Sequence, residues 1–203
     1  MLIGLDFDNT IAGYDSVFTE AAVEEELLAP GEAATKLGVR TKLFERFDGE
    51  RDWMRLQGKV YGNYMPKAEL IEGVGSFLKV CRDRRIPVRI VSHKTKFGHF
   101  DPDRVNLREA ALKWMDARNF FTSDGFGLSP DMVSFESTRV EKVRRIAAIG
   151  CTHFIDDLIE VYEEPEFPKS TARYLYVGRG NPMPKGDFEA FSNWHGLARE
   201  LLG

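Results

Sequence analysis

The chain opens with an apolar stretch from Met1 to Phe7 that lacks the alternation of a half-buried strand. A short apolar run of this kind predicts a strand that is buried on both faces, as in a parallel sheet. Comparable runs recur at residues 88–92 (VRIVS), 132–135, 152–157 (THFIDD) and 174–177 (YLYV). The pattern therefore predicts five strands of one buried sheet.

Between these strands, the apolar residues are spaced as on one face of a helix. This spacing predicts helices at residues 76–85, 103–117, 139–149 and 188–202. Thr138 and Glu141 fit a capping box at the start of the third helix, and Gly150 fits its end. Strands that alternate with helices predict βαβ units, so we expect an α/β fold with a parallel sheet between two layers of helices.

Residues 12–72 follow a different pattern. They are rich in charge, and their apolar residues recur at roughly helical spacing with breaks near Pro30 and Gly49. This pattern predicts several short helices that do not belong to the main sheet. We therefore predict a core domain of residues 1–11 and 73–203, with a helical segment of residues 12–72 inserted into it.

The composition is that of an ordinary globular protein. The 203 residues are 43% hydrophobic and 30% charged, with a net charge of −4, which gives no electrostatic reason to expect nucleic acid or an anionic membrane as a partner. No apolar run approaches the ~18 residues needed to span a bilayer, and Asp6 and Asp8 interrupt the N-terminal run too early for a secretory signal. Two cysteines are too few for a disulfide framework. We expect a cytoplasmic protein whose cysteines are core residues.

Reactive side chains stand where three of the predicted strands end. Asp6 and Asp8 end the first strand, Ser92 ends the second, and Asp156 and Asp157 end the fourth. The carboxyl ends of parallel strands meet at one edge of a sheet, where ligands bind. Four carboxylates crowded there repel one another unless a hard cation neutralises them, and Mg²⁺ prefers such oxygen ligands. Because there is no His/Cys cluster, zinc is not expected.

At these positions the chain resembles the haloacid dehalogenase (HAD) superfamily. DFDNT at residues 6–10 resembles the family's first motif, DxDxT, the serine of VRIVS resembles the second, and FIDD resembles the fourth, in the family's order. Lys142, near the start of the helix before FIDD, is the best match for the lysine of the third motif. Lys94 and Arg139 are the alternatives for that position.

The resemblance implies a role for each matched residue. Asp6 resembles the nucleophile that forms an aspartyl-phosphate, and Asp8 the general acid and base, whose backbone carbonyl also ligates Mg²⁺. Lys142 is expected to offset charge in the transition state. Beside Asp6, Asp156 resembles the metal ligand on the second side of the site, and Asp157 a further ligand or a support for Asp156.

Candidate substrate-binding residues surround this set: Thr10, Ser92, His93 and Lys94. Ser92 is expected to hydrogen-bond a phosphoryl oxygen. For Thr10, a hydrogen bond within the loop or a helix cap is the alternative. For His93 and Lys94, the alternative is an ordinary polar loop.

The resemblance also implies a reaction. Asp8 favours phosphate ester hydrolysis over halide displacement, which has no leaving-group oxygen to protonate. Residues 12–72 resemble the family's helical cap, which implies a small substrate such as a sugar phosphate or a nucleotide. We expect a Mg²⁺-dependent phosphatase that acts on a small phosphate monoester. The alternatives are a phosphotransferase or phosphomutase that uses the same site, and a HAD-like binding protein without turnover.

Overall fold

The computed structural model describes all 203 residues, Met1–Gly203, and they form two compact units. The first comprises residues 1–12, 70–94 and 118–203, and the second comprises residues 13–69 and 95–117. The centre of the first unit is a six-stranded sheet in the order β5-β4-β1-β6-β7-β8, and every pairing in it is parallel. Its strands are β1 (Ile3–Leu5), β4 (Val88–His93), β5 (Val133–Glu136), β6 (His153–Asp156), β7 (Ala172–Tyr176) and β8 (Glu189–Phe191). The predicted α/β class is confirmed.

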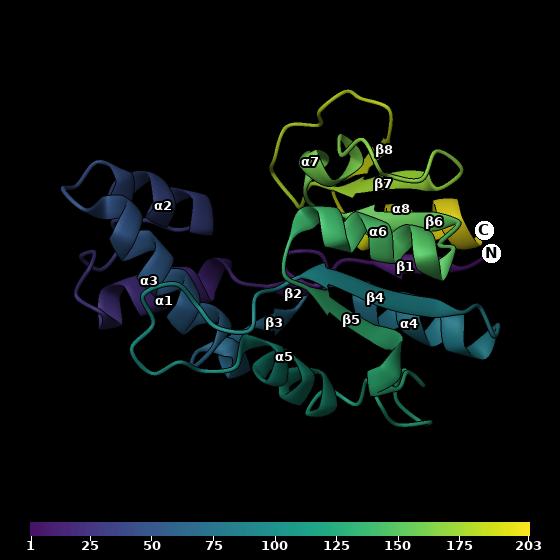
Figure 1. The fold of residues 1–203 in the computed structure, drawn as a ribbon, viewed down its shortest axis with the longest axis horizontal. Helices are drawn as coiled ribbons and strands as arrows, with labels where there is room; N and C mark the ends of the chain where they lie inside the picture. The colour runs from purple at the N-terminus through teal and green to yellow at the C-terminus, as the bar shows by residue number, and fades with distance from the viewer. The chain divides into compact units, whose positions relative to one another are not determined.

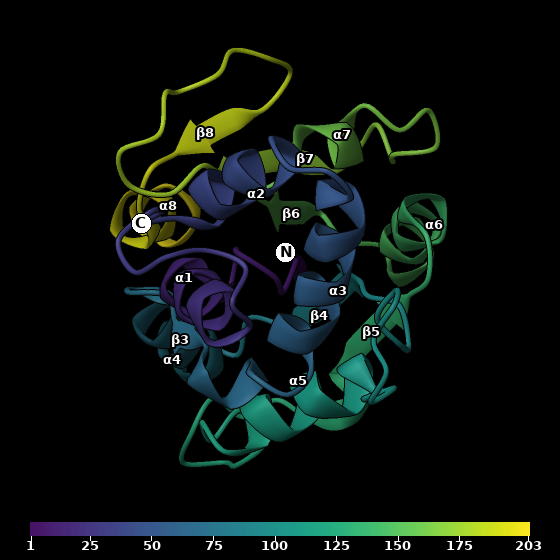
Figure 2. The ribbon, with the colours of Figure 1, turned by 90° about the vertical axis from the view of Figure 1, so that its left-hand side faces the viewer.

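Helices cover both faces of this sheet, as Figures 1 and 2 show. One face carries α6 (Arg139–Ile149), and the other carries α4 (Val74–Asp83) and α8 (Trp194–Leu202). The short elements η2 (Pro130–Met132) and α7 (Ile159–Tyr162) complete the unit. The apolar residues packed under α6 form one buried cluster that includes Val91, Val143, Ile146, Phe154 and Leu175. The sheet is therefore the middle layer of three.

Local sequence signals account for the elements that matter to the site. The Thr138 side chain accepts a hydrogen bond from the Glu141 amide in the predicted capping box, and Gly150 ends α6 with φ 75°. The small residue in the middle of β1 is also required, because a Cβ at Gly4 would lie 2.4 Å from the Phe154 ring. Both cysteines are buried, and burial raises the pKa of Cys81 to about 12 and that of Cys151 to about 11. These thiols are core side chains, as expected.

The second unit is helical. It contains α1 (Asp15–Glu24), α2 (Lys36–Phe44), α3 (Gly49–Tyr61), the single turn η1 (Met65–Lys67) and α5 (Leu107–Asp116). Its core is aromatic, with Phe18 stacked on Trp53 at 5.0 Å and packed edge-on against Tyr61 at 5.7 Å between ring centroids. The strands β2 (Ala12–Gly13) and β3 (Glu69–Leu70) pair in a separate two-stranded sheet.

The second unit contains a segment that the sequence analysis placed in the core domain. Residues 95–117 group with residues 13–69, because α5 packs against α3 and η1. Trp114 donates a hydrogen bond from Nε1 to the carbonyl oxygen of Ala68 at 2.8 Å, and the Asn63 side chain donates one to Asp103 at 2.9 Å. Long-range contacts of this kind leave no periodic signal in the sequence.

Two predicted helices are shorter than expected. The predicted helix at 188–202 begins at Trp194, because residues 189–191 instead pair with β7 as β8, and Asn193 caps the helix by accepting a hydrogen bond from the Gly196 amide. The predicted helix at 103–117 begins at Leu107, where the Asn106 side chain caps it. No helix combines the length and apolar character required to cross a membrane.

Candidate active site

The first carboxylate of the site stands at the end of β1. The Asp6 amide donates a hydrogen bond to the Ile155 carbonyl of β6 at 2.8 Å, which continues the sheet pairing by one residue. The Asp6 side chain is 6% exposed. The chain then turns sharply, because the Phe7 carbonyl accepts hydrogen bonds from the amides of Ile11 and Ala12. Asn9 adopts φ 59° within this turn. The tight loop keeps Asp8 close to Asp6.

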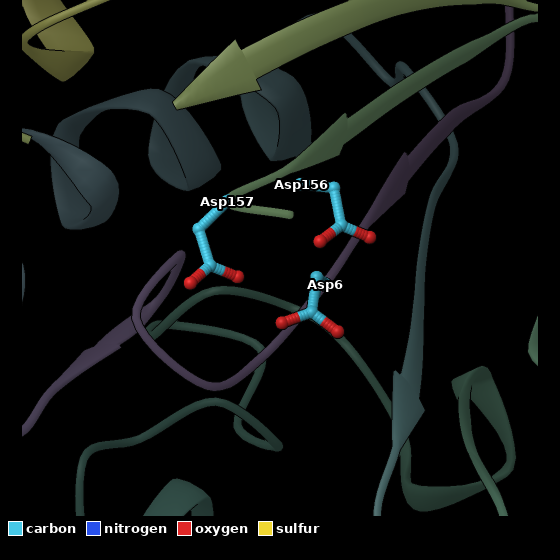
Figure 3. A group of neighbouring side chains, drawn as sticks. All are labelled: Asp6, Asp156 and Asp157. Atoms are coloured by element: carbon cyan, nitrogen blue, oxygen red, sulfur yellow. The ribbon is translucent and has the colours of Figure 1, made fainter. Parts of the chain in front are cut away.

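The neighbouring strand β6 brings two further carboxylates to the same edge. Asp6, Asp156 and Asp157 each offer an oxygen, and these oxygens all lie within 4.8 Å of one another. Figure 3 shows the three side chains gathered where β1 and β6 end. Asp156 is fully buried, and one of its oxygens accepts a hydrogen bond from the Leu158 amide at 3.0 Å. The predicted convergence of the strand-end carboxylates is therefore present in the fold.

A buried lysine lies between two of these carboxylates. Lys142, in the second turn of α6, donates from Nζ to Asp6 Oδ1 at 2.5 Å and to Asp156 Oδ2 at 2.6 Å. Its side chain is 1% exposed. Arg139 instead pairs with Glu164 at 3.5 Å. Of the three cations considered for the third motif, Lys142 is the one in contact with both Asp6 and Asp156.

Burial and charge act in opposite directions on Asp6. The loss of hydration raises the pKa of its carboxyl to about 7, against the attraction of Lys142, and the negative charges of Asp156 and Asp8 add to the rise. For Lys142, burial lowers the pKa, but the adjacent Asp156 and Asp6 carboxylates outweigh it, so the net shift is upward. Lys142 therefore keeps its charge, whereas the ionisation of Asp6 is opposed by its surroundings.

The fourth carboxylate has a different cation as its partner. Lys94 Nζ lies 3.1 Å from Asp8 Oδ1 and 2.8 Å from Asp8 Oδ2. Lys94 follows the last residue of β4, and its amide donates to the Glu136 carbonyl at 2.9 Å. The site thus holds four carboxylates and two ammonium groups, which leaves two formal negative charges.

The remaining candidates lie around this group. Ser92 is buried at 1% exposure in β4, beside β1. His93 is exposed, and its Nε2 lies 3.0 Å from the Ser137 carbonyl oxygen. Thr10 is fully buried, and its Oγ1 has no hydrogen-bond partner in the structure. The structure therefore contains neither the loop hydrogen bond nor the helix cap that was considered for Thr10, and its contact with a substrate stays a prediction.

The donor set fits a divalent cation. Asp6, Asp156 and Asp157 provide only carboxylate oxygens, which are the ligands of hard ions such as Mg²⁺. One doubly charged ion also balances the two formal negative charges that Lys94 and Lys142 leave. Both the chemistry of the donors and the charge balance are therefore consistent with Mg²⁺.

Two residues that support the site were not singled out from the sequence. Asn9 donates from Nδ2 to Asp157 Oδ2 at 3.2 Å, which links the β1 loop to the end of β6. Trp194, the first residue of α8, donates from Nε1 to the carbonyl oxygen of Thr10 at 3.0 Å, so α8 anchors the same loop. A signal for Asn9 was available, because asparagine is favoured where the backbone turns left-handed. No signal existed for Trp194, which is 184 residues from Thr10.

A cavity elsewhere in the first unit is separate from this chemistry. It has a volume of about 260 Å³ and lies at the opposite edge of the sheet, where Val88 begins β4, between α4 and residues 126–132. Its lining is mainly apolar and includes Leu78, Phe126 and Leu128. None of the strand-end carboxylates lines it.

Comparison with known proteins places the fold. No protein-family model matches the chain, and no curated protein sequence does. Among solved structures, it is similar to a HAD family hydrolase from Deinococcus radiodurans with bound phosphate and sodium (14% identity, 97% of this chain and 92% of that chain covered, TM-score 0.57). It is also similar to a phosphoserine phosphohydrolase-like protein from Francisella tularensis (10% identity, 98% of this chain and 99% of that chain covered, TM-score 0.58). A third similar structure is that of a HAD hydrolase of family IA from Entamoeba histolytica (10% identity, 96% of this chain and 94% of that chain covered, TM-score 0.59). At these identities the likeness shows a HAD-like fold.

Proposed function

We propose that this chain is a HAD-superfamily phosphatase, which hydrolyses a small phosphate monoester through an aspartyl-phosphate with the help of Mg²⁺. The observation that carries the proposal is the group formed by Asp6, Asp156 and Asp157 at the carboxyl edge of a HAD-like sheet, with Lys142 bonded to Asp6 and Asp156. The motif residues that suggest the family in the sequence are the residues that meet at this edge. Structural neighbours described as phosphatases or hydrolases support the same class.

In the first step, a carboxylate oxygen of Asp6 forms a bond to phosphorus while the bond from phosphorus to the leaving-group oxygen breaks. Asp8 gives its proton to that oxygen, so the product leaves as an alcohol. Lys142 donates a hydrogen bond to Asp6 and carries positive charge next to the phosphoryl group. Ser92 is proposed to donate a hydrogen bond to a phosphoryl oxygen.

In the second step, Asp8 takes a proton from water, and the resulting nucleophile attacks phosphorus. The bond between phosphorus and the Asp6 oxygen breaks, which releases inorganic phosphate and restores Asp6. A divalent cation held by Asp6, Asp156, Asp157 and the Asp8 carbonyl supplies charge that offsets the phosphoryl oxygens when it is bound. Asn9 holds Asp157 in place for this role.

The second unit is proposed to act as a cap. Residues 13–69 and 95–117 form a helical body of their own, which is suited to restricting access to a small substrate. Under this proposal the substrate is a small organic phosphate rather than a macromolecule.

Phosphate release from a panel of sugar phosphates, nucleotides and p-nitrophenyl phosphate tests the proposal. We expect turnover with Mg²⁺, loss of turnover in EDTA, and loss of at least about 10³-fold in Asp6→Asn, which removes the nucleophile. Asp116→Asn is the matched control, because Asp116 is an exposed carboxylate at the end of α5. Turnover that survives in Asp6→Asn, or that is equal with EDTA and Mg²⁺, contradicts the mechanism. Transfer of the phosphoryl group to an added sugar instead of water indicates a phosphotransferase.

A further inference from the structure

Lys94 is one of the few buried charged residues of the first unit, and its position is fixed from several sides. Its side chain is 2% exposed, whereas that of Asp8 is 17% exposed. The ammonium lies 5.7 Å from the centre of the Phe7 ring. Its amide is bonded to the Glu136 carbonyl, so the backbone continues the pairing of β4 with β5. A lysine is rarely buried unless a partner holds its charge.

The partner of Lys94 is held by both of its oxygens. Nζ lies within hydrogen-bond distance of Oδ1 (3.1 Å) and of Oδ2 (2.8 Å) of Asp8. A cation that bridges both oxygens fixes the rotation of the carboxylate as well as its position. Asp8 itself belongs to the tight loop after β1, whose backbone hydrogen bonds fix its Cα. Lys94 therefore helps to set the orientation of the Asp8 carboxyl group.

Lys94 and Lys142 thus contact different carboxylates of the site. Lys142 contacts Asp6 and Asp156, and Lys94 contacts Asp8. A lysine committed mainly to the transferring phosphoryl group would be expected on the side of Asp6, which is where Lys142 lies. The pairing of Lys94 places it on the side of the proton donor instead.

From this geometry we infer that Lys94 is a positioning residue, which orients the Asp8 carboxyl group toward the leaving-group oxygen. The inference rests on the proposed function, because it assigns a support to the general acid of that mechanism. It differs from the sequence prediction that Lys94 binds the substrate. The consequence is selective: Lys94 matters most for esters whose leaving group must be protonated as it departs, and least for esters with a good leaving group.

Two substrates of nearly the same shape separate these cases. The p-nitrophenolate ion leaves without a proton, whereas phenolate is a far stronger base and gains from protonation. We therefore propose to measure kcat/KM, which includes every step through departure of the first leaving group, for p-nitrophenyl phosphate and phenyl phosphate. The proteins are wild type, Lys94→Met, Lys94→Arg and the control Lys79→Met. Methionine keeps the length of the side chain and removes its charge, and Lys79 is an exposed lysine of α4.

General acid catalysis contributes typically ~10²–10⁴-fold, so loss of orientation in Lys94→Met is expected to lower the ratio of phenyl to p-nitrophenyl phosphate kcat/KM by about 10-fold or more. Lys94→Arg restores the ratio to within about 3-fold of wild type, because a guanidinium also bridges two carboxylate oxygens. Turnover of p-nitrophenyl phosphate by Lys94→Met shows in the same sample that the variant is folded. Lys79→Met leaves both rates unchanged.

Two results overturn the inference. If Lys94→Met slows both esters equally, the residue binds the phosphoryl group or supports the fold, and does not orient Asp8. If a folded Lys94→Met protein slows neither ester, Lys94 has no part in leaving-group departure. A wild-type protein that hydrolyses neither ester with Mg²⁺ present contradicts the proposed function instead, and this outcome is visible before any variant is compared.

Discussion

The buried carboxyl of Asp6 should make the protein less stable when it ionises without a metal. Burial raises its pKa from 3.8 to about 7 even though Lys142 lies 2.5 Å away. Between these two pH values, the folded chain holds a proton on Asp6 that the unfolded chain has lost. The contribution of Asp6 to stability is therefore complete below about pH 4 and is lost as the pH rises through about 7. In metal-free protein, Asp6→Asn should not lose this stability as the pH rises, because asparagine does not ionise.

The size of the effect follows from the shift. A rise of about 3 pKa units at about 1.4 kcal/mol per unit corresponds to roughly 4 kcal/mol at pH 8, as an upper value. In EDTA at pH 8, Asp6→Asn should be more stable than wild type by up to this amount, or by about 8 to 16 °C in Tm for a chain of this size. Below pH 4 the two proteins should unfold at nearly the same temperature. Lys142 keeps Asp156 as a partner in the variant, so its charge is not left alone.

Thermal unfolding of both proteins from pH 4 to pH 8 in EDTA measures this difference, with Asp116→Asn as the control for an exposed carboxylate. Saturating Mg²⁺ should narrow or reverse this difference in unfolding temperature, because wild type retains the Asp6 carboxylate as a metal ligand and the variant lacks it. If wild type is the more stable protein at pH 8 in EDTA, the attraction of Lys142 exceeds the cost of burying Asp6. This result contradicts the expected loss of stability on ionisation of Asp6.

Three further outcomes are expected. Lys142→Met should lower kcat at least about 10²-fold, which an activity assay measures. It should also destabilise the metal-free protein by about 3–5 kcal/mol in urea unfolding with EDTA, because two buried carboxylates lose their shared cation. Thr10→Val should leave stability within about 1 kcal/mol of wild type in urea unfolding, because the buried Oγ1 has no hydrogen bond to lose. Asn193→Ala should cost about 1 kcal/mol in the same assay, because the first turn of α8 loses its cap. A cost of several kcal/mol for Thr10→Val, or none for Asn193→Ala, contradicts these assignments.

The parts of the fold that could be predicted from sequence are those with local causes. Buried strands leave continuous apolar runs, and α6 begins and ends at residues that Thr138, Glu141 and Gly150 specify chemically. The strand-end carboxylates were predictable for the same reason, since parallel strands bring their carboxyl ends to one edge whatever their order. The sequence did not specify that order, and it did not separate β8 from α8. Residues 189–191 form a strand only because β7 offers them a partner.

The assignment of residues 95–117 shows a second limit of sequence patterns. The helix within this segment has an apolar face, which by itself does not specify the unit that it packs against. What decides its place is a set of single contacts with η1 and α3, such as the hydrogen bond from Trp114 to Ala68. Such contacts depend on the positions of whole elements, and a periodic pattern along one helix does not encode them.

The pairing of cations with carboxylates was beyond sequence analysis for a different reason. Lys94 lies just after the serine of the second motif and Lys142 lies before FIDD, and both have side chains long enough to reach several acids at the sheet edge. Their partners depend on where each side chain starts. Lys142 extends from α6, which packs against β4 and β5, whereas Lys94 directly follows β4. Because these origins lie on different elements, the two ammonium groups serve different carboxylates. The proposed mechanism needs this separation, since under it one carboxylate attacks phosphorus while another faces the departing oxygen.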